Sequence, residues 1–286
     1  MQDRPSRAIR LYGTDEPVAP ARILSAGPLS AELEAGNLRY IRFGGTEVMR
    51  AVSFIVRDKD WGTYNPAIGD LFIEETDTHF TVSYTARTAD AGQAFVYRAR
   101  IEGDAGGRLT FSAKGSGESD FLTNRTGFVI LHAVEGVAGH PVEMVHVDGR
   151  TVRGTFPDVI DPVQPMMDLR ALTHWTQDGL AVTCLMEGDT FEMEDQRNWT
   201  DASYKTYVRP LALPWPYTLK AGEEIEQAGD AVEMLAQAFE LEGQCQAGAD
   251  LAGARGLFAQ LVEILLGREL GRMHADHHDL LREGRL

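Results

Sequence analysis

The stretch HFTVSYTARTADAGQAFVYRARIEGDAGGRLTFSAKG, residues 79–115, decides the fold class. It contains three runs, residues 79–87, 94–104 and 108–115, in which apolar and polar side chains alternate. A period of two places successive side chains on opposite faces of an extended chain, so each run is typical of a strand with one buried face. Gly106 and Gly107 supply a turn before the third run. The stretch therefore predicts consecutive strands of an antiparallel sheet.

The same pattern continues outward in both directions, from about residue 29 to residue 217. LRYIRF (38–43) alternates, and GFVILHAV (127–134) is a continuous apolar run, as expected of a strand buried on both faces. VEMVHVDG (142–149) and LAVTCLMEGD (180–189) each end in a turn that contains glycine. No helical pattern intervenes. The chain is therefore predicted to be mainly β, a large antiparallel β-sandwich built from two broad sheets.

The pattern changes after residue 222. Residues 223–244 fit a last strand or a helix, whereas Phe258, Leu261, Val262 and Leu265 share one face at helical spacing. We therefore expect a β-sandwich domain over residues 1–230 and a helical C-terminal tail over residues 231–286. The tail would pack on the sandwich or on a second subunit, and the latter arrangement would give a homodimer.

Composition excludes several classes of protein. The 286 residues carry a net charge of −16, which repels phosphate backbones, so we expect no nucleic-acid partner. No stretch approaches the roughly 20 apolar residues of a membrane span, and the N-terminus has no apolar segment typical of a secretory signal. Two cysteines do not make a disulfide framework. These features favour a cytoplasmic protein that does not bind membranes.

The segment FEMEDQRNWTDASYKTYVRPL, residues 191–211, concentrates charge and aromatic surface within predicted strands. Alternation places Glu192 and Glu194 on one face and Asp195 on the other. Two carboxylates on one face repel each other unless a cation, a metal or a proton lies between them, and Arg197 and Lys205 are nearby cations. Carboxylates that accept and cations that donate hydrogen bonds suit the hydroxyl groups of a sugar. A salt-bridged edge strand in solvent is the alternative.

Two further segments contribute candidate residues. In FLTNRTGFVILHAVEG (121–136), Asn124 and Arg125 precede a buried strand that carries His132, and binding groups collect at strand ends. His132 fits a general acid or base, and also a core histidine with one hydrogen bond. In RDKDWGTYNP (57–66), Trp61 fits a binding loop or an aromatic plug in a turn.

The candidate residues fall into two groups. The catalytic candidates are Glu192, Glu194, Arg197 and His132. The substrate-binding candidates are Asn124, Arg125, Asp195, Asn198, Trp199, Asp201, Lys205 and Trp61.

Metal binding has two candidate locations. His274, His277 and His278 lie at spacings that can hold a metal, although a charged helix end is the favoured interpretation. The clustered carboxylates would allow a divalent ion. We expect no cofactor and no dedicated metal site.

Four segments together resemble the N-terminal region of the D-apionate lactonase family: LYGTDEP (11–17), VRDKDWGTY (56–64), FLTNRTGFVILH (121–132) and, most specifically, FEMEDQRNWTDASYKTYVRPLALPWPYTL (191–219). The resemblance covers residues 11–222 and implies hydrolysis of a D-apionolactone-like lactone to its aldonic acid in branched-sugar catabolism. Family members continue into a further, barrel-like region, and here a short tail is expected instead. A sugar lactone or sugar acid is the implied partner.

The resemblance leaves three functions open, besides a purely structural module whose tail makes a dimer. In a lactonase, Glu192 or Glu194 would position or deprotonate water, and Arg197 or Lys205 would stabilise the oxyanion. A second alternative is a carbohydrate-binding or sugar-acid-binding sandwich without activity. The predicted sandwich also resembles galactose-mutarotase-like supersandwiches, which pair a histidine with a carboxylate, so a third alternative is a ring-opening enzyme that uses His132 with Glu192 or Glu194.

Overall fold

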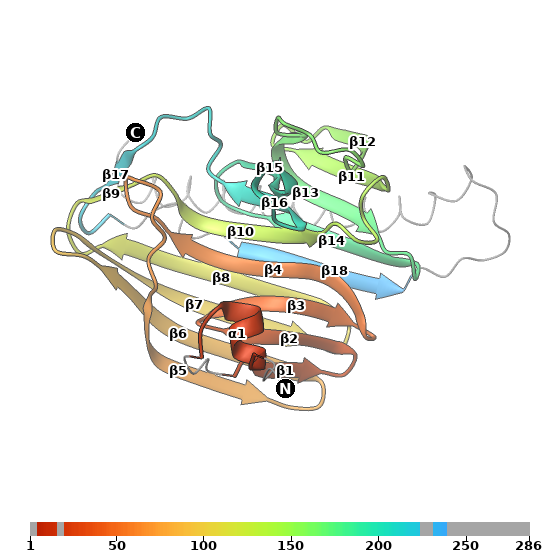
Figure 1. Ribbon diagram of the computed structural model, residues 1–286, viewed down its shortest axis with the longest axis horizontal. Coiled ribbons are helices and arrows are strands. Elements are labelled where there is room, and N and C mark those ends of the chain that lie inside the picture. Colours follow the sequence, from red (N-terminus) through yellow and green to blue (C-terminus); the bar gives the residue numbers. More distant parts are fainter. Residues whose placement is uncertain (1–4, 16–19, 224–230, 239–286) are drawn as a thin grey trace, which may run out of the picture. The chain divides into compact units, whose positions relative to one another are not determined.

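The computed structural model describes residues 5–15, 20–223 and 231–238, and these residues are almost entirely β-structure (Figure 1). The elements are α1 (Arg7–Tyr12), β1 (Arg22–Ala26), β2 (Leu29–Glu34), β3 (Asn37–Phe43), β4 (Thr46–Val56), β5 (Ala67–Glu75), β6 (His79–Ala89), β7 (Ala94–Asp104), β8 (Arg108–Gly117), β9 (Phe121–Thr123), β10 (Thr126–Ala133), β11 (Pro141–His146), β12 (Thr151–Thr155), β13 (Met166–Trp175), β14 (Leu180–Met186), β15 (Phe191–Asp195), η1 (Gln196–Trp199), β16 (Ser203–Val208), β17 (Tyr217–Leu219) and β18 (Ala231–Ala238). The mainly β prediction is confirmed. Within the described part, no helix is both long and apolar enough to cross a membrane.

The strands follow one continuous antiparallel path, in the order β1-β2-β3-β4-β10-β16-β15-β13-β14-β18-β8-β7-β6-β5. Strands β11 and β12 extend from β13, and β17 pairs with β9 in a separate two-stranded sheet. The path turns back on itself, since the Gly27 amide donates to the Asp77 carbonyl at 2.7 Å and Arg22 pairs with Glu75 at 2.8 Å. Strands β4 and β10 cross in front of β8 and β18 in Figure 1. The result is a two-layered sandwich, as predicted, although both layers belong to one continuous sheet and not to the two separate broad sheets that were expected.

Aromatic side chains hold the two layers together. Phe54 of β4 lies 4.6 Å from Tyr97 of β7, and Phe128 of β10 lies 5.1 Å from Phe111 of β8, measured between ring centroids. The Tyr84 hydroxyl donates to the carbonyl of Gly36 at 2.6 Å. Position 36 requires glycine, because its φ is +81° and an added Cβ would lie 2.9 Å from the Tyr84 ring.

The chain after residue 230 differs in part from the expectation of a helical tail. Residues Ala231–Ala238 form strand β18, which pairs with β14 on one side and β8 on the other. Met234 and Ala236 are fully buried at alternate positions, so this segment belongs to the sandwich. The sheet therefore extends to residue 238. The rest of the expected tail, with His274, His277, His278 and the expected dimer contact, lies outside the described residues.

Candidate functional site

Strand register places the two glutamates of β15 on the face of the sheet turned away from the core. Glu194 lies opposite Lys205 of β16, and Glu192 lies opposite Tyr207. Directly opposed residues of an antiparallel pair share a face. We call this face, on strands β15, β16, β10 and β4, the outer face. The sequence prediction that both glutamates share a face is consistent with this register.

Glu194 is the carboxylate of a compact polar group on the outer face. Its Oε2 lies 3.0 Å from Lys205 Nζ, its Oε1 accepts a hydrogen bond from the indole of Trp199, and both members of the ion pair are mostly buried. Burial lowers the pKa of Lys205, and Glu194 opposes this shift. Arg125 and Arg57 lower the pKa of Lys205 further, so both guanidinium groups lie within electrostatic range.

The two arginines come from neighbouring strand ends. The Arg57 amide, after β4, donates to the carbonyl of Arg125, before β10, at 2.8 Å, which extends the β4–β10 pairing by one residue. The Arg125 guanidinium carbon lies 3.8 Å from the centre of the Tyr207 ring and 5.4 Å from that of Trp61. Burial lowers the pKa of both arginines, and Glu194 partly offsets the shift in each. We call Arg57, Arg125 and Lys205 the cation cluster.

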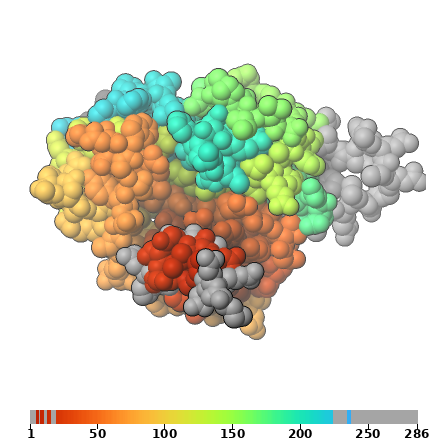
Figure 2. All heavy atoms as spheres, in the orientation of Figure 1, coloured from red at the N-terminus to blue at the C-terminus, as the bar shows by residue number. Residues whose placement is uncertain are grey.

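Indole rings surround this group. Trp61 and Trp215 pack edge to face with centroids 5.3 Å apart. Trp199 is 70% exposed and Trp215 is 52% exposed, although both side chains are large and apolar. Figure 2 shows the outer face hollowed between the orange surface around residues 50–65 and the teal surface around residues 190–205. Exposed indoles beside buried charges suit a ligand with both apolar ring faces and hydroxyl groups.

Glu192 lies on the same face but is covered. Its side chain is buried, and its Oε1 accepts from the Tyr207 hydroxyl at 2.6 Å and from the Leu211 amide at 2.9 Å. Burial, followed by the hydrogen bond to Glu192, raises the pKa of Tyr207. Glu192 therefore holds Tyr207 and the chain at residue 211 in place, and Glu194 is the carboxylate left beside the cation cluster.

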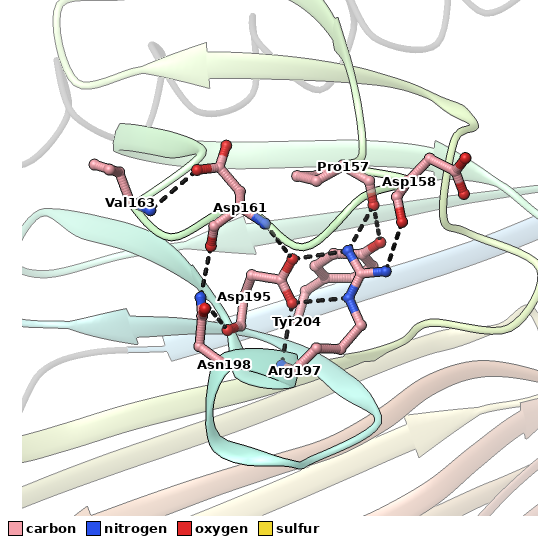
Figure 3. Close-up of polar contacts among 8 residues, drawn as sticks. All are labelled: Pro157, Asp158, Asp161, Val163, Asp195, Arg197, Asn198 and Tyr204. Atoms are coloured by element: carbon pink, nitrogen blue, oxygen red, sulfur yellow. Dashed lines mark hydrogen bonds and ion pairs between the residues drawn. The ribbon is translucent and has the colours of Figure 1, made fainter.

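Three of the expected site residues, together with Tyr204, form a separate structure, the loop clamp, shown in Figure 3. Arg197 binds both carboxylate oxygens of Asp195, at 2.9 and 2.7 Å, and donates to the carbonyls of Asp158 and Pro157 at 2.8 Å. The clamp residues are Asp195, Arg197, Asn198 and Tyr204, which together bind the backbone of residues 157–161. The structure gives Arg197 a loop-holding position rather than one beside Glu194.

His132 lies on the core side of the sheet. Its neighbour Leu131 pairs with Lys205 on the outer face, so His132 points the opposite way. Its Nε2 lies 2.9 Å from Thr206 Oγ1, and its ring is 6.0 Å from that of His174. Burial, and then His174, lower the pKa of His132 to about 3. The structure therefore does not bring His132 together with either glutamate.

Two other expected residues, Asn124 and Asp201, make hydrogen bonds to the backbone of nearby loops. Asn124 is buried and donates from Nδ2 to the Lys59 carbonyl at 2.6 Å, which holds the loop that carries Arg57 and Trp61. Asp201 is exposed, and its amide donates to the Gln196 carbonyl in the turn after η1.

Sequence reasoning missed three residues of the group, Arg57, Tyr207 and Trp215. Arg57 stands in the quoted segment VRDKDWGTY, and Tyr207 follows Lys205 at the two-residue spacing that places both on one face. Among the described residues, no three His, Cys, Asp or Glu side chains are grouped so that they could hold a metal ion.

Comparisons with known proteins agree with this fold and segment pattern. The family model described as D-apionate lactonase, N-terminal domain, matches residues 9–234. A D-apionate lactonase from Brucella anthropi is 54% identical over 219 residues, which are 76% of this chain and 36% of that protein. The chain thus spans about a third of the length of this relative.

Similarity to solved structures concerns the fold alone. A Synechocystis protein aligns with a TM-score of 0.56 at 9% identity, over 79% of this chain and 99% of that one. A galactose mutarotase-like protein from Lactobacillus casei aligns with a TM-score of 0.49 at 10% identity, over 76% and 99% of the two chains. Because the family model covers most of the sequence and the Brucella relative is so similar, the chain belongs to the family of D-apionate lactonase N-terminal domains.

Proposed function

We propose that this chain forms the sugar-lactone site of a lactone hydrolase, which converts a D-apionolactone-like lactone to its aldonic acid in branched-sugar catabolism. The observation that supports this most is Glu194, held on the outer face between Lys205 and the exposed indole of Trp199. The family membership and the name of the Brucella relative point to the same reaction class.

In the proposed reaction, Glu194 is the general base. Water attacks the lactone carbonyl carbon while its proton passes to Glu194, and the resulting oxyanion is stabilised by the Lys205 ammonium group. The tetrahedral intermediate then collapses, the ring C–O bond breaks, and Glu194 returns the proton to the departing alkoxide. The products are a hydroxyl group and a carboxylic acid, which releases one proton near neutral pH.

Lys205 replaces Arg197 as the proposed oxyanion group because of its position. Its Nζ already lies 3.0 Å from Glu194, whereas the Arg197 guanidinium is engaged with Asp195 and two carbonyls. Lys205 is largely buried, and a charge excluded from water acts more strongly on a developing oxyanion than an exposed one. Arg57 and Arg125 add positive potential from the same side.

The ring-opening alternative receives no support from the placement of its residues. It needs a histidine and a carboxylate that face one substrate, and His132 lies on the core side of the sheet, opposite the glutamates. The binding-module alternative differs from the proposal in turnover alone, so the same assay separates them. Cytoplasmic location and a homodimer remain expectations from the sequence.

The test is proton release from the lactone by wild type and by Glu194→Gln, with Glu118→Gln as a matched control. Glu118 pairs with Arg87 on the exposed surface. We expect Glu194→Gln to lower kcat by about 100-fold or more, the usual contribution of a general base, at nearly unchanged Tm. The control should keep the wild-type rate, and a chelator should leave it unaltered. An unchanged rate in Glu194→Gln would remove Glu194 from the mechanism, and a thermal shift without proton release would indicate a binding module.

A further inference from the structure

Arg57 and Arg125 lie side by side at the end of the outer face, and the acids near them are already engaged. The Glu194 carboxylate binds Lys205 and Trp199. The Asp58 Oδ1 atom accepts hydrogen bonds from the backbone amides of Asp60 and Gly62. Within the described part of the chain, no carboxylate oxygen is recorded within 4.0 Å of either guanidinium group.

Both arginines also retain unused donors. The Nε atoms of Arg57 and Arg125 are buried and have no hydrogen-bond partner among the described residues. Arg125 is only 2% exposed, so its Nε is shielded from bulk solvent. A buried donor without a partner costs about 1–3 kcal/mol, and more when the group is charged. A native site that keeps two such donors together is organised for an acceptor that is not part of the described chain.

Charge points to an anionic acceptor. Burial lowers the pKa of Arg125, and the charge of Arg57 lowers it further, because two neighbouring cations repel each other. Guanidinium groups nevertheless stay protonated in proteins, so the repulsion remains until an anion reduces it. Lys205 has Glu194 as its counter-ion, and Arg57 has Asp58 within electrostatic range. Arg125, the most buried of the three, forms no ion pair within 4.0 Å among the described residues, and its interactions with Tyr207 and Glu194 leave its pKa lowered by burial.

Shape favours a planar carboxylate. The Tyr207 and Trp61 rings lie against the Arg125 guanidinium, so its in-plane N–H edge is the part left for a polar ligand. That edge matches two carboxylate oxygens, and the paired arginine doubles the number of donors. The hydrolysis proposed above creates a carboxylate from a neutral lactone within the same group of residues.

We infer that Arg57 and Arg125 form a carboxylate subsite that binds the open-chain hydroxy acid more tightly than the neutral lactone. This inference rests on the proposed function for the identity of the acid. Its consequence is that the enzyme retains its product: the acid inhibits competitively, with an inhibition constant at least tenfold below the KM for the lactone.

The experiment is calorimetric titration of the full chain with three ligands: the sugar acid, the matching alditol in which a hydroxymethyl group replaces the carboxylate, and inorganic phosphate. Wild type should bind the acid at least tenfold more tightly than the alditol, and high salt should reduce that preference. Equal affinity for acid and alditol would overturn the inference. Binding of phosphate more tightly than the acid would overturn the assignment to a carboxylate.

The variants are Arg125→Gln and Arg57→Gln, with Arg87→Gln on the exposed surface as the matched control. Each site variant should lose at least tenfold in affinity for the acid while alditol affinity changes less than threefold, and the control should match wild type. If Arg125→Gln does not fold, the half-buried Arg57 carries the test. Unchanged acid binding in folded Arg57→Gln would overturn the subsite.

This test is separable from that of the proposed function. Tight, arginine-dependent binding of the acid without lactone turnover would refute the proposed hydrolysis and support the subsite. Turnover that depends on Glu194, with acid and alditol bound equally, would support hydrolysis and refute the subsite.

Discussion

Removal of the Asp195 carboxylate from the loop clamp tests whether this segment is structural. Asp195 is fully buried at its side chain and accepts four hydrogen bonds: three from Arg197, at 3.1, 2.9 and 2.7 Å, and one from the Asp161 amide at 3.1 Å. In Asp195→Ala the Arg197 guanidinium loses its counter-ion, and the Asp161 amide loses its acceptor. Breaking a buried ion pair from one side costs about 3–5 kcal/mol.

The lower figure applies here because the Arg197 side chain remains 17% exposed and keeps two carbonyl partners. A loss of about 3 kcal/mol in the free energy of unfolding lowers Tm by about 6–12 °C in a domain of this size. The assay is thermal unfolding followed by circular dichroism at pH 7. Asp148→Ala, which removes an exposed partner of Arg150, is the control and should change Tm little.

The pH dependence supplies a second check. Burial alone would raise the pKa of Asp195, but the hydrogen bonds from Arg197 and Asp161 outweigh it and hold the pKa below its ordinary value of 3.8. A carboxyl whose folded pKa is lowered contributes stability above its unfolded pKa and loses it as pH falls through the folded pKa. The Tm difference between wild type and Asp195→Ala should therefore narrow below pH 3.8. If Asp195→Ala keeps the wild-type Tm at pH 7, the structural assignment is refuted. If Arg197→Gln loses turnover at an unchanged Tm, Arg197 has a catalytic role and not a structural one.

The remaining predictions concern three other positions. Lys205→Met should lower kcat by about 100-fold or more in the proton-release assay, because the oxyanion loses its proposed partner; a rate within threefold of wild type would contradict the role. Trp199→Ala should raise KM with little change in Tm, since the indole is 70% exposed; a large drop in Tm at unchanged KM would count against it. Burial lowers the pKa of His132 to about 3 from 6.5, so the unfolded chain binds an extra proton between these values and stability falls as pH decreases below 6.5. His132→Gln should flatten this part of the Tm–pH curve, and an unchanged slope would refute the assignment.

Local sequence determined the fold class and the faces of individual strands. The alternation in residues 79–115 predicts three strands, and the structure contains β6, β7 and β8 there. The spacing of Glu192 and Glu194 places both on one side of β15, with Asp195 on the other, because side chains alternate in any extended chain. The segment pattern was also specific enough to indicate the family.

Pairing between distant segments was decided by the tertiary structure. Arg57 and Arg125 meet because β4 pairs with β10, and no local pattern encodes which strands become neighbours. The partners of Arg197 were also decided by the tertiary structure. The sequence suggested a cation available to Glu192 and Glu194, whereas Arg197 binds carbonyls of the loop at residues 157–158.

The assignments of His132 and β18 depended on context of the same kind. A continuous apolar run has no alternation that would show which face of the strand carries His132. The face is known only because Leu131 pairs with Lys205 on the outer face, which places His132 on the core side. Residues 231–238 are rich in helix formers, yet they lie between β14 and β8, where the ladder hydrogen bonds of two neighbours outweigh a weak local preference. Local chemistry thus determined which side chains were available, and long-range strand pairing determined which of them share a site.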